Sequence, residues 1–289
     1  MIAGRGFGVK APGRTAIPLR VTVEAPKEGT LERWAWDLVT SDSLDRKRAP
    51  GTPPFARDPS YVPARLTQPG RPAHLTRTTR RKKTPRANAL VMPARRAELL
   101  HVFAHHELQA AELFAWAMLA FADGPELFVR GLSALACDEA RHFAAYETRL
   151  AELGHPFGSF PVRDWFWERV GGVSDAASFC AFVGLGLESA NLDHTRRFEA
   201  ELRAAGDEAA ASLTEAIGRE EIAHVRFAAR WFEHFTGTLD LETFAAKLPP
   251  PLSPMLFRGR PIDREARKAA GWPDAMVEAL DRWIAPPRA

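Results

Sequence analysis

Two copies of one short pattern of acidic and histidine residues constrain this chain more than any other feature. Each copy has a single glutamate in an apolar stretch, followed 32 or 33 positions later by Glu-x-x-His. The six residues are Glu107, Glu139 and His142 in the first copy and Glu188, Glu221 and His224 in the second. Residues three positions apart lie on one face of an α-helix, so each Glu-x-x-His pair can reach a single metal ion.

The neighbours of these acids indicate that the acids are buried. An isolated glutamate on a helix is usually exposed to solvent, and a lone histidine is more often a core residue than a ligand. Here each acid lies on an apolar stripe: Phe103 and Ala111 flank Glu107, and Leu185 flanks Glu188. An unpaired buried carboxylate is too costly to keep ionised. Six such residues in a doubled register therefore predict a metal site.

The apolar periodicity predicts four long helices that carry these residues. They are expected at residues 94–122, 126–153, 175–205 and 208–236, with turns at Asp123–Pro125 and Gly206–Asp207 and a longer connection between the second and third. In each half, the lone glutamate lies about as many residues before the turn as the glutamate of Glu-x-x-His lies after it. Because antiparallel helices rise equally per residue, the two glutamates meet at a similar height along the helix pair. Four helices that each direct such a ligand inward form the dimetal site of a ferritin-like bundle.

The predicted fold is therefore all-α, a ferritin-like four-helix bundle with an irregular Pro- and Arg-rich N-terminal arm and short C-terminal helices. The arm covers residues 1–90, with a short strand expected at 18–25 and one short helix at 30–48. Its many prolines exclude long helices. The bundle covers residues 91–240. The tail, 241–289, is expected to pack on the bundle with short helices near 264–270 and 273–284.

Charge is distributed unevenly along the chain. Residues 1–96 carry 20 Lys and Arg against 7 Asp and Glu, whereas the remaining residues carry 19 against 29. One interpretation is that a basic arm wraps and neutralises an acidic bundle. The alternative is a nucleic-acid contact through the basic run Arg77–Lys83. The first interpretation is favoured, because no aromatic residues interleave with that run.

Cysteine use and hydropathy bear on the compartment. The two cysteines, Cys137 and Cys180, are far apart and do not form a disulfide framework, which suits a reducing environment. No uninterrupted apolar stretch of about 20 residues is present, and the N-terminus lacks the apolar core of a signal peptide. We therefore expect a cytoplasmic protein with no membrane contact.

Three further residues are candidates for supporting the metal site. Glu112 and Asp193 each lie five positions after the lone glutamate of their half. We expect them to orient the ligating histidines; the alternative is that both are surface acids. Tyr146 lies one helical turn beyond His142, where it could donate a hydrogen bond or an electron to the site. The alternative is a core tyrosine.

Several segments of the chain match motifs of a known family. They are HHELQAAEL, DEARHFAAYETRLAELGH, LESANLD, RAAGDEA and EEIAHVRFAARWF, with IDREARKAAGW in the tail. Together they resemble the ferritin-like family catalogued as domain of unknown function 455, most strongly over residues 90–235. Asn191 stands where that family has glycine, and the segment before DREAR departs further. The resemblance implies a ferritin-like bundle with a dimetal centre. It extends, more distantly, to tRNA-hydroxylating and other oxygen-activating diiron proteins.

The expected cofactor is a pair of iron ions, with manganese as the alternative, because carboxylate and imidazole ligands suit both metals. The first functional hypothesis is an oxidase or hydroxylase that uses dioxygen, an electron donor and an unidentified small-molecule or RNA substrate. The second is an iron-handling ferroxidase or storage protein. The third is a metal-binding bundle without catalysis. All three require the same six ligands.

Overall fold

The regular secondary structure of the described part of the chain is helical. The computed structural model describes residues 24–80 and 84–284. Within these ranges the chain forms helices and no strand, apart from one isolated bridge between Arg77 and Val162. The all-α prediction is confirmed for these residues. Most of the strand expected at 18–25, and residues 81–83 of the basic run, lie outside them.

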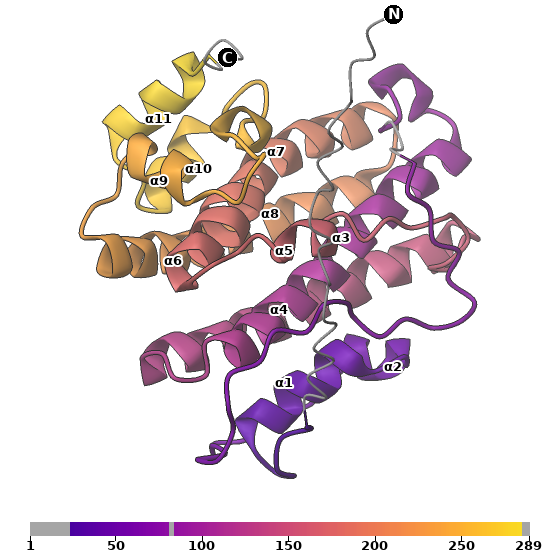
Figure 1. The fold of residues 1–289 in the computed structure, drawn as a ribbon. Helices are drawn as coiled ribbons and strands as arrows, with labels where there is room; N and C mark the ends of the chain where they lie inside the picture. Colours follow the sequence, from indigo (N-terminus) through magenta and orange to yellow (C-terminus); the bar gives the residue numbers. More distant parts are fainter. Residues whose placement is uncertain (1–23, 81–83, 285–289) are drawn as a thin grey trace, which may run out of the picture.

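Four long helical stretches form the centre of the molecule (Figure 1). They are α3 (Pro93–Ala120), α4 (Glu126–Glu152), α8 (Glu208–Thr236) and a composite of α6 (Ala176–Phe179), η2 (Cys180–Glu188) and α7 (Ser189–Ala204). The helix α3 packs on α4, α7 packs on α8, and α4 packs on α8. Sequence signals place the ends: Asp207 caps α8 by accepting a hydrogen bond from the amide of Ala210, and Gly237 ends it in a left-handed conformation.

The middle of the third stretch is π-helical, which the apolar periodicity did not predict. The segment η2 widens the helix over nine residues and ends at Glu188. A Cβ atom on Gly184 would overlap the Cβ atom of Ala228 on α8, so glycine permits the close approach of η2 to α8. π-helical segments occur mostly at functional sites. This one carries a predicted ligand at its last residue.

The N-terminal arm carries two α-helices instead of the one expected over residues 30–48. They are α1 (Leu31–Thr40) and α2 (Leu44–Arg48), followed by the short 3-10 helix η1 (Ala87–Ala89). The chain turns between α1 and α2, where the Ser43 hydroxyl accepts a hydrogen bond from the amide of Arg46 and starts a new helix. Figure 1 shows both helices on one side of the molecule, where α1 packs on α3 and α2 on α4.

Ion pairs fasten this basic arm to the long helices. Arg48 donates to Glu147 of α4 at 2.8 Å, and Arg57 pairs with Glu126 at the start of α4. These contacts fit the interpretation in which the arm wraps and neutralises the acidic helices.

The tail packs on the opposite side, against η2, α7 and α8 (Figure 1). It contains α9 (Leu241–Lys247), the 3-10 helix η3 (Pro254–Phe257), α10 (Arg264–Ala269) and α11 (Asp274–Arg282). The last two correspond to the predicted short helices, whereas α9 was not predicted. The connection before α6 holds one more short helix, α5 (Trp167–Val170). None of the described helices combines the length and apolar character needed to cross a bilayer.

Two hydrophobic clusters form the core and leave a gap between them along α4 and α8. On α4, Ala136 belongs to the larger cluster and Phe143 to the smaller one. On α8, Val225 belongs to the larger cluster and Ile217 to the smaller one. The predicted ligands of α4 and α8 lie between these positions, so apolar packing above and below isolates the acidic residues from bulk water.

Candidate metal centre

All six predicted ligands meet at the centre of the four long helices. They form two overlapping groups, Glu107, Glu139, His142 and Glu221 in one and Glu139, Glu188, Glu221 and His224 in the other. Within each group, one ligand atom from every residue lies within 4.8 Å of the others. Two glutamates belong to both groups, while each group has its own histidine and its own lone glutamate. All six side chains belong to residues that are at most 4% exposed.

Most donor atoms of this cluster face one another without hydrogen bonds, and the exception is Oε1 of Glu221, which accepts one from Nδ2 of Asn191 at 3.2 Å. The Nδ1 atom of His224 lies 2.7 Å from Oε1 of Glu139 and 3.0 Å from Oε2 of Glu221. Even so, both Glu139 oxygens, Oε2 of Glu221 and the Nδ1 atoms of His224 and His142 have no hydrogen-bond partner among the described residues. Buried polar atoms without partners are rare. Two divalent ions such as iron or manganese would coordinate these atoms, so the residues fit a dimetal centre.

Burial and crowding change the protonation of these groups. Burial, together with the neighbouring carboxylates, raises the pKa of Glu107 and of Glu188 well above the usual value. Burial alone would lower the pKa of His142, but contacts with Glu107 and Glu139 and the charges of nearby carboxylates raise it to about 12. Burial would raise the pKa of Glu139, but the charges and contacts of His224 and His142 together outweigh burial and hold this pKa below the usual range. Protons therefore occupy part of the cluster when metal is absent.

An acid from the opposite half contacts the outer nitrogen of each histidine. The Nε2 atom of His142 on α4 lies 3.0 Å from Glu220 on α8, and Nε2 of His224 on α8 lies 3.4 Å from Asp138 on α4. A carboxylate at the outer nitrogen fixes the ring and leaves Nδ1 free to bind metal. Arg141 donates to Asp138 at 3.0 Å and to Glu220 at 2.5 Å, so the two acids are linked.

The sequence analysis did not identify these outer acids. Asp138 and Glu220 each come directly before the glutamate of a Glu-x-x-His motif, so the same position is acidic in both halves. That repetition was the signal that could have identified them.

Glu112 and Asp193 are buried, but they do not orient the histidines as predicted. Glu112 accepts a hydrogen bond from Nζ of Lys47 at 2.7 Å and pairs with Arg71. Asp193 accepts a hydrogen bond from Nη2 of Arg267 at 2.8 Å. Both acids thus pair with buried cations from distant parts of the chain. Glu112 fastens the N-terminal arm to α3, and Asp193 fastens the tail to α7.

Tyr146 lies in the smaller hydrophobic cluster, one turn beyond His142. Its hydroxyl contacts Oγ1 of Thr214 at 3.5 Å, and its ring lies 5.6 Å from that of Phe103. Burial raises the pKa of Tyr146 well above its usual value, so the phenol stays protonated. In the described residues it makes no hydrogen bond to a predicted ligand, a placement that fits the core-tyrosine alternative.

Fold and cluster together define an all-helical protein with four carboxylates and two imidazoles buried at its centre. The family described as protein of unknown function (DUF455) matches residues 29–278, and the chain belongs to this family. That range runs from the turn before α1 into α11 and contains all six residues of the cluster.

One relative has a known sequence but no described function. It is a protein of Haemophilus influenzae, described as an uncharacterized protein, that is 27% identical over 186 residues. The match covers 61% of this chain, and the chain spans 64% of the length of that relative. No solved structure matches the chain.

Proposed function

We propose that this chain is a ferritin-like four-helix-bundle protein that binds two iron ions and uses dioxygen to oxidise or hydroxylate an organic substrate. The observation that carries the proposal is the convergence of four glutamates and two histidines around five buried donor atoms without hydrogen-bond partners. This ligand set, drawn from four helices with two Glu-x-x-His motifs, is typical of dimetal carboxylate bundles. Manganese is the alternative metal, because the same donors suit it.

The proposed role of each residue follows from whether it belongs to one or to both of the two ligand groups. Glu139 and Glu221 belong to both ligand groups and would help to hold both ions, while His142 and His224 each belong to one group and would help to hold one ion. Bound iron would supply the redox chemistry with dioxygen. The four carboxylates offset the charge of the two ions, and the apolar clusters on either side exclude water from the site.

A cavity beside the cluster favours an organic substrate over iron storage. It has a volume of about 450 Å³ and is bordered by Glu107 and Glu188, the two lone glutamates. Cavities of ~300–1,000 Å³ typically hold small organic ligands. A ferroxidase or storage protein would use the same metal ligands but would not need a cavity of this size.

Metal analysis of variants tests the dimetal site. We expect the purified protein to hold two metal ions per chain, and Glu139→Ala and Glu221→Ala each to hold one or none. Because the two apolar clusters pack the long helices on either side of the cluster of acids, the helical content of both variants should stay near that of the wild type. Inductively coupled plasma mass spectrometry measures the metal, and circular dichroism measures the helical content.

Glu152→Ala is the matched control, because Glu152 lies on the same helix as Glu139 but its half-exposed side chain pairs only with Arg149. The dimetal assignment is abandoned if both site variants keep wild-type metal content, or if the control loses metal as readily. Oxygen chemistry is tested separately, by loading ferrous iron without air and then admitting oxygen. A change in the ultraviolet and visible spectrum is expected, and a metal-replete protein with no change contradicts oxygen activation.

A further inference from the structure

The cavity beside the candidate metal centre lies between α3 and the continuous stretch of η2 and α7, which carry the two lone glutamates. Residues from Glu98 to Ala110 of α3 border one side, and residues from Leu187 to His194 border the other. Glu107 and Glu188 are 4% exposed, whereas the shared glutamates Glu139 and Glu221 are fully buried. The cavity therefore reaches the cluster at the lone glutamates.

The N-terminal arm builds the outer wall of this cavity. The amide of Thr78 donates to the carbonyl of Val162, and the amide of Val162 donates to the carbonyl of Thr76, both at 2.9 Å. This short ladder fixes the arm against the connection between α4 and α6. Thr78, Arg80 and Thr84 of the arm border the cavity as a result. The arm thus does more than neutralise charge, since it helps to enclose the space next to the metal centre.

Apolar and uncharged groups line the inner part of the cavity. Phe166, Phe257 and Leu187 border it. His106, whose ring lies 5.0 Å from that of Phe166, and His194 add imidazole groups. Burial, with the charge of Arg197 nearby, lowers the pKa of His194, so this imidazole is uncharged at neutral pH. Such a lining suits the apolar, flat body of a ligand and offers it a few hydrogen bonds.

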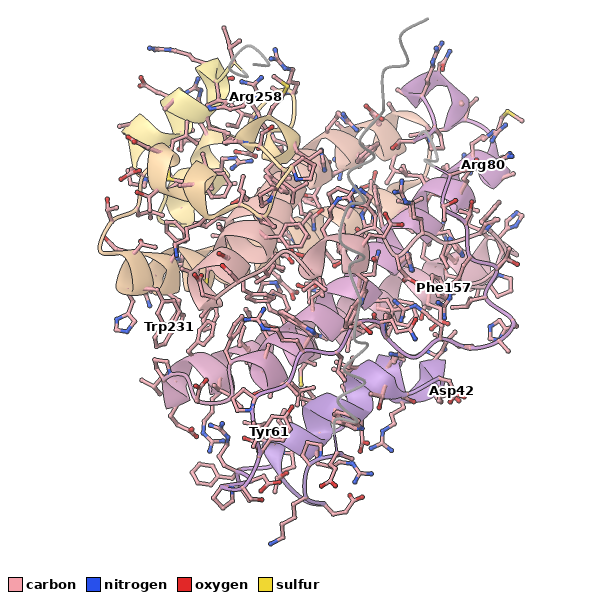
Figure 2. All side chains as sticks on the ribbon, in the orientation of Figure 1. Asp42, Tyr61, Arg80, Phe157, Trp231 and Arg258 are labelled. Atoms are coloured by element: carbon pink, nitrogen blue, oxygen red, sulfur yellow. The ribbon has the colours of Figure 1, made fainter. Side chains whose placement is uncertain are left out.

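The lining of the cavity carries the cation Arg80 and the carboxylate Glu98, to which Arg95 donates a hydrogen bond at 2.7 Å. Arg80 is exposed and forms no ion pair with any residue in the described ranges. Figure 2 labels it on the side of the molecule where α3 begins. The other guanidinium of the lining, that of Arg163, is bound by both carboxylate oxygens of Glu168 at 3.0 and 2.6 Å. An anionic group entering the cavity would therefore find its partner at Arg80.

We propose that this cavity binds a small aromatic molecule that carries one anionic group. The aromatic body lies against Phe166 and Phe257, and the anion stays at the rim beside Arg80. The orientation follows from the lining, because Arg80 is exposed whereas Phe166 and Phe257 are buried. The role of this molecule as a substrate rests on the proposed function. The binding itself is tested without turnover.

Three probes with the same naphthalene ring separate the contribution of the aromatic ring to binding from that of the charge. They are 2-naphthoate, 2-naphthyl phosphate and the neutral 2-naphthamide, each titrated into the purified full chain by isothermal calorimetry. We expect at least one of the two anions to bind about tenfold or more tightly than the amide. The carboxylate and the phosphate are compared directly, so the tighter of the two identifies the kind of anionic group.

Charge reversal at the rim tests the role of Arg80. Arg80→Glu is expected to abolish the preference for the anions while leaving the affinity for 2-naphthamide unchanged. Arg86→Glu is the matched control, because Arg86 is exposed on the same segment and does not border the cavity. The control should keep the preference. An anion preference that survives Arg80→Glu, or that falls equally in Arg86→Glu, overturns the assignment of Arg80.

Filling the cavity tests its role as the binding site. Val102 of α3 borders the cavity, so Val102→Trp should weaken all three probes about tenfold or more at unchanged metal content. Val91→Trp is the control, since Val91 is 63% exposed and lies outside the cavity. Unchanged binding in Val102→Trp overturns the proposal, as does a wild-type chain that binds none of the probes or binds the amide as tightly as the anions.

The two proposals fail in different ways. If the dimetal assignment is wrong, the purified chain contains no metal but still binds 2-naphthoate. If the cavity assignment is wrong, the chain contains its metal but binds none of the three probes.

Discussion

Each histidine of the metal cluster uses its two ring nitrogens for different purposes. Nδ1 of His142 and of His224 faces the glutamates, and Nε2 faces Glu220 or Asp138 near the surface. The outer acids are therefore not ligands, yet they decide which nitrogen carries the proton. Each acid belongs to the half of the chain that does not contain its histidine.

We predict that Asp138→Asn and Glu220→Gln each lower metal affinity by roughly 10- to 100-fold, because the ring loses the carboxylate that orients it. A competition titration with a chromophoric chelator measures the affinity. Glu152→Gln on α4 serves as the control and should bind metal like the wild type. Wild-type affinity in both outer-acid variants would show that these acids do not support the site.

Metal binding is also predicted to release protons. Glu107 and Glu188 hold protons at neutral pH in the metal-free protein, and the pKa of His142 is about 12. All three must lose a proton to bind metal. Because lower pH favours the protonated forms, affinity should fall as pH falls from 8 to 5. Calorimetric titrations in buffers of different ionisation enthalpy count the protons, and a binding enthalpy that is the same in every buffer contradicts the prediction.

The convergence of these six residues into one cluster could be predicted from the sequence because their spacing is local. A spacing of three residues on a helix is visible in the letters, and so is the repetition between the two halves. The partners of Glu112 and Asp193 could not be predicted in this way. Lys47 lies 65 positions from Glu112, and Arg267 lies 74 positions from Asp193. Only the folded chain brings these groups together.

At the scale of elements, the acid five residues after each lone glutamate fastens a different segment to the long helices, the N-terminal arm in the first half and the C-terminal tail in the second. Glu112 of α3 binds Lys47 of α2 and Arg71 of the arm, whereas Asp193 of α7 binds Arg267 of α10. All of these side chains are fully buried. A buried charge needs its partner, since desolvation is offset only by pairing.

We predict that Glu112→Gln lowers the free energy of unfolding by about 3–5 kcal/mol, because Lys47 and Arg71 lose a buried counter-charge. Urea denaturation followed by circular dichroism measures the change. Glu152→Gln removes a half-exposed carboxylate and should change the free energy by less than about 1 kcal/mol. A similarly small change in Glu112→Gln would show that the arm does not depend on this pair.

Helix boundaries were largely visible in the sequence, and the character of one helix was not. Turn residues such as Gly206 and Asp207 mark the start of α8, and a capping hydrogen bond to Asp207 confirms its role. The π-helical segment depends instead on how η2 meets α8 at Gly184 and Ala228. That contact between distant residues leaves no periodic signal in the sequence.

At the scale of the whole molecule, the candidate metal centre joins all four long helices. Its residues come from α3, α4, α8 and the end of η2. A metal that binds only the folded state stabilises that state by mass action. The packing of the arm and the tail, in contrast, does not depend on the cluster.

Removal of metal is therefore predicted to lower the melting temperature. With free metal at about 100 times its dissociation constant, bound metal should contribute roughly 2.7 kcal/mol to the stability. Differential scanning calorimetry with and without a chelator measures the difference. The double variant Glu139→Ala, Glu221→Ala should melt at the same temperature in both conditions. A wild-type chain that melts at one temperature, whether or not the chelator is present, would contradict the prediction.

The two shared glutamates imply that the two metal positions fill cooperatively. Glu139 and Glu221 contribute to both ligand groups, so the first ion fixes half of the second position before the second ion arrives. The conformational entropy of those side chains is lost once, and the second ion binds to a preorganised set of oxygens. Molecules with one ion should be scarce at every metal concentration. The protein would then respond to its supply of metal as a switch between empty and full.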